Sequence, residues 1–201
     1  MQRSFLTALV AIAAVVAGVA VAALLSRPTT GELAHLTVLP APRTLPAALT
    51  VTDDSGTQRP LDSFTGRWQL VFAGFTYCPD ICPATLAQLA QVHDALPAIS
   101  VQLFSVDPER DDPARLRAYV QHFDPGFGAF TTDEPALGQV ARALSVAYAK
   151  VPTGDTYTVD HSSAVAILNP RGQLAAFVTP PFDVPGIVSD LQTLIGSGPD
   201  A

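Results

Sequence analysis

Apolar residues in the globular part of the chain follow the two periodicities that strands and helices impose. Trp68–Phe75 is apolar almost throughout, which is typical of a central strand covered on both faces. Ser100–Val106 has a similar pattern and predicts a second strand. Between them, Leu86, Leu89 and Leu96 recur at helical spacing. A helix should therefore join the two strands, and a right-handed crossover makes them parallel.

The remaining apolar pattern continues this alternation to the end of the chain. The other expected elements are a strand at 49–52, a helix capped by Asp112, helices at 134–144 and 184–195, and a hairpin of strands 163–168 and 174–178 around a turn at 169–172. This order predicts an α/β domain with a central mixed sheet flanked by helices. Sites on such sheets gather at the carboxyl edge of the strands, which the segments after Phe75 and Val106 both reach.

The N-terminal part of the chain is apolar in a different way, because Phe5–Leu25 carries no charged residue. A helix of that length, rising about 1.5 Å per residue, can cross the roughly 30 Å hydrocarbon layer of a membrane. Arg3 precedes the run and Arg27 follows it, and the positive-inside rule then favours a cytoplasmic N-terminus. The alternative is a cleaved signal peptide, for which Ala20–Ala22 offers a cleavage site.

These features divide the chain into four expected parts. Residues 1–4 form a cytoplasmic N-terminus and residues 5–25 a transmembrane anchor. Residues 26–44 are rich in proline and have little periodicity, so we expect a tether. Residues 45–201 form the folded domain, which is long enough for one hydrophobic core.

Charge and cysteine content narrow the function. The formal net charge of −7 argues against a nucleic-acid partner, which usually requires a basic patch. The chain has 2 cysteines, Cys78 and Cys82. In a domain outside the cytoplasm, two such close thiols could form a disulfide, hold a metal ion, or alternate between these states.

The cysteine segment lies between the buried strand and the following helix. Asp80 is placed to cap that helix, and Pro83 falls in its first turn, where a missing N–H is harmless. Cys82 is then close to the helix N-terminus, whose partial positive charge stabilises a thiolate. Three residues separate Cys78 from Cys82, so the two sulfurs can converge on one ion.

The ligand set decides which metal is expected. Two soft thiolates with one imidazole suit copper, and zinc is the alternative. Structural zinc almost always requires four protein ligands, and the chain has only 2 cysteines. Copper(I) accepts two or three ligands and is therefore favoured.

Three of the 4 histidines are poor candidates for the third ligand. His35 falls in the expected tether and should be solvated. His93 lies on the same helix as Cys82, roughly 16 Å further along its axis at 1.5 Å per residue, so it cannot share the metal. His122 falls near a helix C-terminus, where a histidine interacts favourably with the helix dipole.

His161 differs from the other histidines because it immediately precedes the strand at 163–168. If that strand runs antiparallel to Trp68–Phe75, its beginning lies at the same sheet edge as the cysteines. Asp160 or Ser162 could then orient the imidazole ring. The pattern alone leaves open whether His161 is a ligand or an ordinary surface histidine.

Three segments together resemble the signature blocks of the SCO/SenC family. They are Thr76–Pro83, Ser105–Asp111 and Val159–Ser162, and their order and spacing match over roughly residues 48–195. The resemblance implies a thioredoxin-like fold in a membrane-tethered copper-binding protein. It also implies a role in assembling the dinuclear copper centre of cytochrome c oxidase, and some members act as thiol–disulfide reductases.

Carried over residue by residue, the resemblance places the two copper thiolates on Cys78 and Cys82 and the copper imidazole on His161. The cofactor would be Cu(I), Cu(II) or both. The partner would be the copper-accepting subunit of cytochrome c oxidase or another copper or thiol protein. The excess of arginine over lysine and the lack of an Arg/Ser-rich transit peptide favour a bacterial inner membrane, with the domain facing the periplasm or cell exterior.

Two other activities use the same cysteines. A thiol–disulfide reductase would use Cys78 and Cys82 as its catalytic redox pair, and a thioredoxin-like peroxidase would use one to react with peroxide and the other to resolve it. His161 favours copper over both. We expect Asp107–Asp111 to shape the rim of the site, with an Arg110 salt bridge. We expect Val151–Asp160 to be a short loop, and because it lacks extra acidic residues it gives little support for a docking surface.

Overall fold

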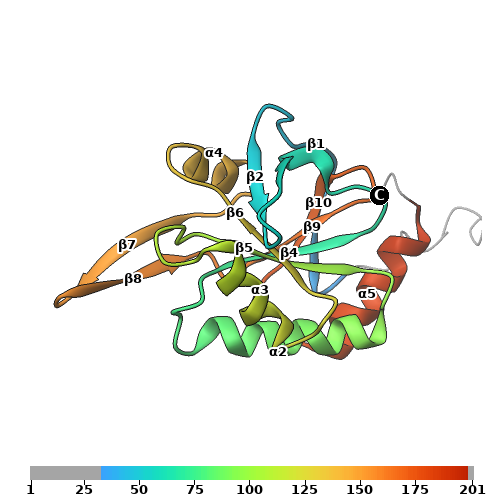
Figure 1. Ribbon diagram of the computed structural model, residues 1–201. Helices are drawn as coiled ribbons and strands as arrows, with labels where there is room; N and C mark the ends of the chain where they lie inside the picture. Colours follow the sequence, from blue (N-terminus) through green and yellow to red (C-terminus); the bar gives the residue numbers. More distant parts are fainter. Residues whose placement is uncertain (1–32, 199–201) are drawn as a thin grey trace, which may run out of the picture. The chain divides into compact units, whose positions relative to one another are not determined.

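The computed structural model describes residues 33–198. Their main sheet has eight strands in the order β1-β10-β9-β4-β5-β6-β2-β3. The strands are β1 (Leu36–Thr44), β2 (Thr50–Asp53), β3 (Gln58–Pro60), β4 (Gln69–Gly74), β5 (Ser100–Ser105), β6 (Gly128–Thr131), β9 (Val165–Leu168) and β10 (Gln173–Val178). β7 (Tyr148–Thr153) and β8 (Thr156–His161) form a separate two-stranded ribbon that extends from the body of the domain (Figure 1).

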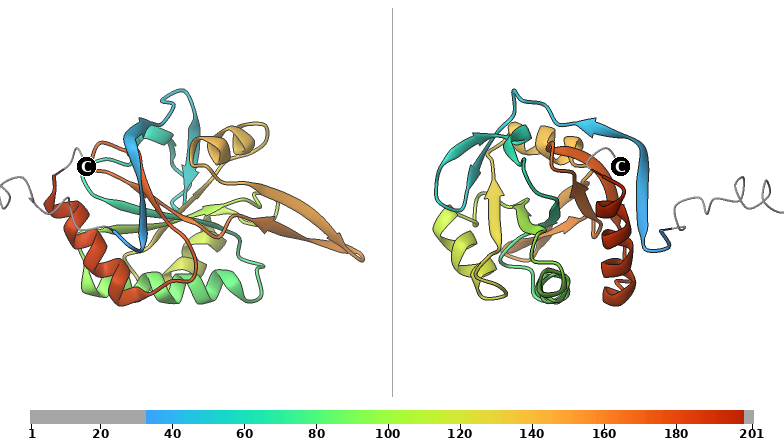
Figure 2. Two further views of the ribbon diagram at one scale, coloured as in Figure 1. Left: turned by 180° about the vertical axis from the view of Figure 1, so that it is seen from behind. Right: turned by 90° about the vertical axis from the view of Figure 1, so that its right-hand side faces the viewer.

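Helices cover the sheet on both sides. They are α2 (Ile81–Ala95), α3 (Pro113–Gln121), α4 (Ala136–Ala143) and α5 (Val184–Gly196), with a short 3-10 helix, η1, at Leu61–Ser63. Figures 1 and 2 show α2 and α5 side by side below the sheet and α4 above it. The predicted helices and the hairpin β9–β10 are confirmed, with ends that differ by one or two residues.

The centre of the sheet explains how the site is positioned. All six residues of β4 are buried, so the nearly continuous apolar run is the central strand that the pattern predicts. β4 is parallel to β5 and antiparallel to β9, with Phe72 opposite Val165. The carboxyl end of β4 and the amino end of β9 therefore lie at one edge of a mixed sheet. The predicted α/β thioredoxin-like class, with its sheet flanked by helices, is confirmed.

The predicted tether at 26–44 is wrong for its second half. Residues 36–44 form β1, which pairs antiparallel with β10 from Leu36 opposite Val178 to Thr44 opposite Gln173. The prolines that suggested a tether, Pro40 and Pro42, lie where the register shifts in this edge strand. Proline is tolerated at edges and irregularities because no ladder hydrogen bond is lost there. The folded domain therefore begins before residue 45.

The prediction of a short loop at 151–160 is also wrong. The segment belongs to the ribbon, in which Tyr148 pairs with His161 and Thr153 with Thr156. Alternation in this segment is masked by Pro152 and by side chains exposed on both faces of β7. Within residues 33–198, no helix has the length and apolar character required to cross a bilayer. The expected anchor at 5–25 lies outside the described residues.

Candidate metal centre

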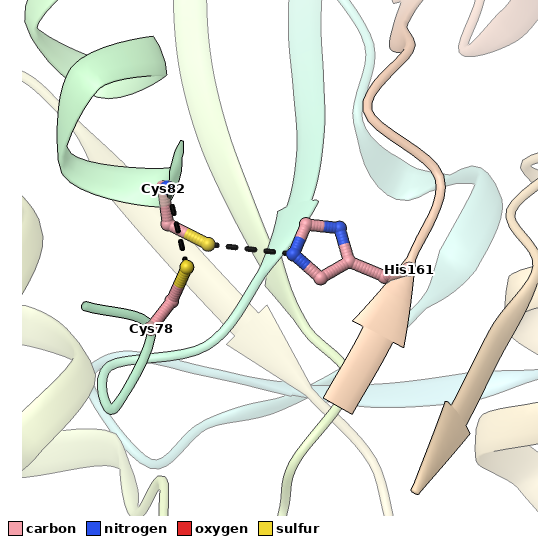
Figure 3. A group of neighbouring side chains, drawn as sticks. All are labelled: Cys78, Cys82 and His161. Atoms are coloured by element: carbon pink, nitrogen blue, oxygen red, sulfur yellow. Dashed lines mark hydrogen bonds between the residues drawn. The ribbon is translucent and has the colours of Figure 1, made fainter. Parts of the chain in front are cut away.

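The cysteine segment leaves β4 and turns directly into α2. Cys78 N–H donates to the carbonyl oxygen of Phe75 at 3.2 Å, which closes a tight turn. The N–H of Cys82, in the first turn of α2, donates to Sγ of Cys78 at 3.3 Å (Figure 3). Asp80 occupies the N-cap position as predicted, but its side chain makes no capping hydrogen bond. The sulfur of Cys78 thus satisfies a helix N–H that a capping side chain often takes.

His161 reaches the cysteines from the other side of the site, as the last residue of β8. Its Nε2 lies 3.4 Å from Sγ of Cys82 (Figure 3). Its Nδ1 lies 3.0 Å from the carbonyl oxygen of Ser162, so a proton on Nδ1 leaves the Nε2 lone pair facing the sulfurs. The rings of Phe72 and Phe75 each meet the imidazole edge to face, with centroids 5.9 Å away. Of the two residues predicted to orient the ring, Ser162 does so, through its backbone carbonyl oxygen.

The three predicted ligand residues therefore converge. The Sγ atoms of Cys78 and Cys82 and a ring nitrogen of His161 all lie within 4.8 Å of one another. Both cysteines are free thiols; Cys82 is buried and Cys78 is partly exposed. Two sulfurs and one imidazole nitrogen are a donor set that suits copper, because thiolates are soft ligands and Cu(I) accepts three-coordination. The side chains present fit that ion.

The electrostatic role of the helix N-terminus differs from the prediction. Burial raises the pKa of the Cys82 thiol, and the neighbouring Cys78 side chain raises it further. The expected stabilisation of a Cys82 thiolate is wrong because burial of the sulfur outweighs it and raises the pKa. The N–H of Cys82 points at the sulfur of Cys78. The first-turn donor of α2 thus serves the more exposed cysteine.

A narrow cleft leads to these residues. It has a volume of about 360 Å³ and opens between the cysteine segment and β8. Its lining is formed by Phe75, Cys78, Pro79, Asp80, Ile81, Thr158, Val159, Asp160, His161 and Ser163. Ile81 in this lining is exposed, as is Tyr77, which precedes Cys78 in the chain. A partner can therefore approach Cys78 and His161 from solvent.

The block Asp107–Asp111 has the structural role predicted for it. Asp107 forms an ion pair with Arg110, and Asp112 caps α3 by accepting the N–H of Arg115 at 2.8 Å. The sequence did not indicate the partner of this ion pair on the ribbon: the hydroxyl of Tyr157 donates to Asp107 at 2.7 Å. A tyrosine in a segment without clear alternation gives no sequence signal for such a contact.

The other histidines lie away from the metal centre. His93 Nδ1 is 2.8 Å from the carbonyl oxygen of Ile99 and takes no part in the metal centre, as expected. His122 is the C-cap of α3, so the helix-end position predicted for it is confirmed. His35 is not simply solvated: its N–H donates to Asp190 at 2.7 Å and its ring lies 3.6 Å from Asp183. These contacts tie the segment before β1 to α5.

Comparison with known sequences places this geometry in a family. A sequence model of the SCO1/SenC family matches residues 40–196. A putative copper-binding protein of Stutzerimonas stutzeri is 32% identical over 164 residues, which are 78% of this chain and 79% of that protein. The human mitochondrial SCO1 homolog is 34% identical over 131 residues, 61% of this chain and 44% of that protein. The chain spans about half the length or less of such mitochondrial relatives, as with 50% of the mouse SCO2 homolog.

Solved structures agree with the sequence match. ScoI of Arabidopsis thaliana with copper bound has 29% identity and a TM-score of 0.66, over 75% of this chain and 96% of that one. Apo Sco1 of Thermus thermophilus has 30% identity and a TM-score of 0.69, over 80% and 96%. Because the family model matches residues 40–196 and the two cysteines and the histidine of the sequence blocks converge in the fold, this chain belongs to the SCO1/SenC family.

Proposed function

We propose that this chain binds one copper ion through Cys78, Cys82 and His161 and delivers it during assembly of the dinuclear copper centre of cytochrome c oxidase. The observation that carries the proposal is the convergence of two sulfurs and one imidazole nitrogen within 4.8 Å. Copper is the cargo of the protein. The relatives support this assignment, since they include a putative copper-binding protein and ScoI structures with copper bound.

Delivery requires ligands that can be exchanged, and the site supports that step. Cys78 is partly exposed and lines the cleft, whereas Cys82 is fully buried. An acceptor thiol or imidazole can therefore replace Cys78 and His161 first, while Cys82 still holds the ion. The copper-accepting subunit of cytochrome c oxidase is the proposed acceptor, and another copper or thiol protein is the alternative.

The same proposal includes a location. The uncharged run from Phe5 to Leu25 would anchor the chain in a bacterial inner membrane, with the domain in the periplasm or outside the cell. Some relatives are described as mitochondrial. A Bacillus anthracis protein, 19% identical, is described as a SCO1/SenC family lipoprotein. In an oxidising compartment the two cysteines can form a disulfide, so copper binding there requires that they be reduced first.

A direct test is copper binding followed by transfer. The reduced full-length chain, titrated without oxygen, is expected to bind one copper ion, and the chain with a Cys78–Cys82 disulfide none. The loaded chain is then mixed with the purified copper-accepting subunit of the host's cytochrome c oxidase, free of copper. Movement of copper to that subunit supports delivery. A reduced chain that binds no copper overturns the whole proposal, and a loaded chain that retains its copper overturns delivery alone.

A second candidate function, thiol–disulfide reduction, is favoured by one specific contact. Sγ of Cys78 accepts a hydrogen bond from a first-turn N–H of α2, which holds it in place, and Cys78 is partly exposed, so a partner disulfide can reach this sulfur. Cys78 would attack a partner disulfide and release one partner thiol. Cys82 would then attack the mixed disulfide and release the second, so that the chain loses two electrons and two protons. His161→Ala should retain this activity and Cys78→Ser should lose it. Loss of disulfide reduction in His161→Ala together with normal reduction in Cys78→Ser would rule out the reductase.

A further inference from the structure

The ribbon β7–β8 carries one of the three ligand residues but is not part of the main sheet. Among the described residues its two strands pair only with each other. His161 is the last residue of β8. The main-sheet ladder therefore does not hold β8 directly, and contacts between the ribbon and the body of the domain help to set the distance of His161 from the thiols.

One face of β8 is turned toward the body. Residues at alternate positions of a strand share a face, which places Tyr157, Val159 and His161 together. Val159 is 3% exposed and belongs to the core, so this face is the inner one. Tyr157 lies four residues before His161, about 13 Å along the strand at 3.3 Å per residue. It can act on the ligand only by orienting the strand.

Tyr157 makes the main contacts between the ribbon and the loop after β5. Its hydroxyl lies 2.7 Å from Oδ1 of Asp107 and 3.1 Å from Oε2 of Glu109, and donates to these carboxylates. The guanidinium carbon of Arg110 lies 3.8 Å from the centroid of its ring. Nη1 of Arg110 also donates to the carbonyl oxygen of Tyr157 at 3.0 Å. Both the side chain and the backbone of this residue are thus held.

A second ribbon residue adds to the same contact. Nζ of Lys150 on β7 lies 2.7 Å from Oε1 of Glu109 and 5.0 Å from the Tyr157 ring centroid. We call these five residues the clasp: Asp107, Glu109 and Arg110 on the loop, and Lys150 and Tyr157 on the ribbon. Lys150 and Glu109 are exposed, so their ion pair contributes little, whereas the contacts to the buried Asp107 are shielded from water and are stronger.

The loop side of the clasp is itself rigid. Asp107 is fully buried, and its N–H donates to the hydroxyl of Ser105 at 3.2 Å. Four residues later in the same loop, Asp111 accepts two hydrogen bonds from Thr76 at the start of the cysteine segment. One loop therefore contacts both halves of the metal centre, the cysteine side through Asp111 and the histidine side through the clasp.

We propose that Arg110 and Tyr157 are positioning residues that hold β8 so that the ring of His161 faces the two thiols. Neither touches the ligand atoms; they act through the strand that carries His161. The inference rests on the proposed copper-binding function and deepens it. Loosening the clasp should have the same effect as removing His161, and no effect once His161 is gone.

The first test is a double-mutant cycle in the reduced full-length chain, with copper affinity as the readout. Tyr157→Leu, which removes the ring and the hydroxyl, should weaken copper binding at least about tenfold when His161 is present. In a His161→Ala background the same change should alter the affinity less than about twofold. An equal loss in both backgrounds means that Tyr157 supports the fold in general and overturns the proposal.

A milder pair of variants guards against misfolding. Tyr157→Phe removes only the hydroxyl bonded to Asp107 and Glu109 and should still weaken copper binding measurably. Thr156→Val is the control, because it removes a hydroxyl from an exposed position of the same strand. Equal affinities of Tyr157→Phe and Thr156→Val would show that the hydroxyl bonds do not position the ligand.

The second test needs no copper. In the reduced apo chain labelled at its 4 histidines, the ring signals of His161 should carry the ring-current shifts of Phe72 and Phe75. Tyr157→Leu should move them toward values of an exposed histidine and leave those of His93 in place. Unchanged His161 signals would overturn the clasp even if copper binding fell. If the unaltered chain bound no copper, the proposed function would fail. The His161 signals would still test whether the clasp positions His161.

Discussion

Asp111 holds Thr76 through both of its carboxylate oxygens. Oδ2 accepts the backbone N–H of Thr76 at 3.0 Å, and Oδ1 accepts its hydroxyl at 2.6 Å. Asp111 is fully buried and also accepts the hydroxyl of Ser105 at 2.7 Å. Because Thr76 begins the segment that carries Cys78, this contact fixes where the cysteine turn starts relative to β5.

Removing the Thr76 hydroxyl should destabilise the domain. Thr76→Val keeps the shape and the backbone bond but leaves one oxygen of the buried Asp111 carboxyl without its partner, which costs about 1–3 kcal/mol. Urea unfolding of the reduced protein measures this. Thr37→Val, at an exposed position of β1, is the matched control and should change stability by less than about 0.5 kcal/mol. Equal stabilities of the two variants would contradict the role given to the Thr76 hydroxyl.

Asp111 should also make stability depend on pH. Burial raises its pKa, outweighing the lowering by hydrogen bonds from Ser105 and Thr76. The folded protein therefore keeps this proton to higher pH than the unfolded chain, whose carboxyl titrates at about 3.9. The contribution of Asp111 is most favourable below that value and diminishes as the pH rises through the folded pKa.

Asp111→Asn removes this titration. The unfolding free energy of the unaltered protein, minus that of Asp111→Asn, should fall as the pH rises from about 4 to about 7. Urea unfolding across this range gives the difference. Asp94→Asn removes an exposed carboxylate on α2 and serves as control. A difference that grows with pH would mean that the native state favours the charged form of Asp111.

Gly74 should be required at the end of β4. A Cβ atom there would lie 3.1 Å from Sγ of Cys82 and 3.1 Å from Cδ1 of Leu103. Gly74→Ala must therefore displace the Cys82 sulfur, with a cost in stability of about 1–3 kcal/mol and weaker copper binding. Gly196→Ala, whose Cβ would meet nothing within 4 Å, should leave both unchanged. Normal copper affinity in Gly74→Ala would show that the sulfur position is not critical.

The place of β1 in the sheet predicts how truncation acts. A chain that begins at Leu45 lacks the partner strand of β10 and the buried Leu36. Compared with a chain that begins at Leu33, it should lose at least about 2 kcal/mol of unfolding free energy, which thermal or urea unfolding can measure. Equal stabilities of the two fragments would mean that β1 is dispensable and that 36–44 acts as a tether after all.

The sequence was a good guide wherever one periodicity dominated a segment. β4 is buried along its whole length, so its apolar run could only be a central strand, and the helix after it placed Cys82 correctly in the first turn. Parallel pairing of β4 with β5 followed from the connecting helix. The spacing of Cys78 and Cys82 indicated a metal or redox pair, whereas His161 became a candidate ligand mainly through the family resemblance; the three side chains do converge.

Other features depend on contacts that a sequence pattern does not encode. β1 is an edge strand that tolerates two prolines at a register shift, and the same residues in isolation are typical of a linker. In the ribbon β7–β8, side chains on both faces of β7 are exposed. That strand therefore lacks the alternation of apolar and polar residues that marks a half-buried strand. The contact of Tyr157 with Asp107 joins residues 50 positions apart and has no local signal.

The central claim, a three-ligand copper site, is tested most directly by copper affinity of the reduced full-length chain and two histidine variants. His161→Ala removes the proposed ligand, and His122→Ala removes an exposed histidine at the end of α3. Competition against a copper chelator of known affinity measures both. We predict that His161→Ala weakens binding at least about tenfold, or about 1.4 kcal/mol, while His122→Ala binds as the unaltered chain does. Unchanged affinity in His161→Ala would contradict the account.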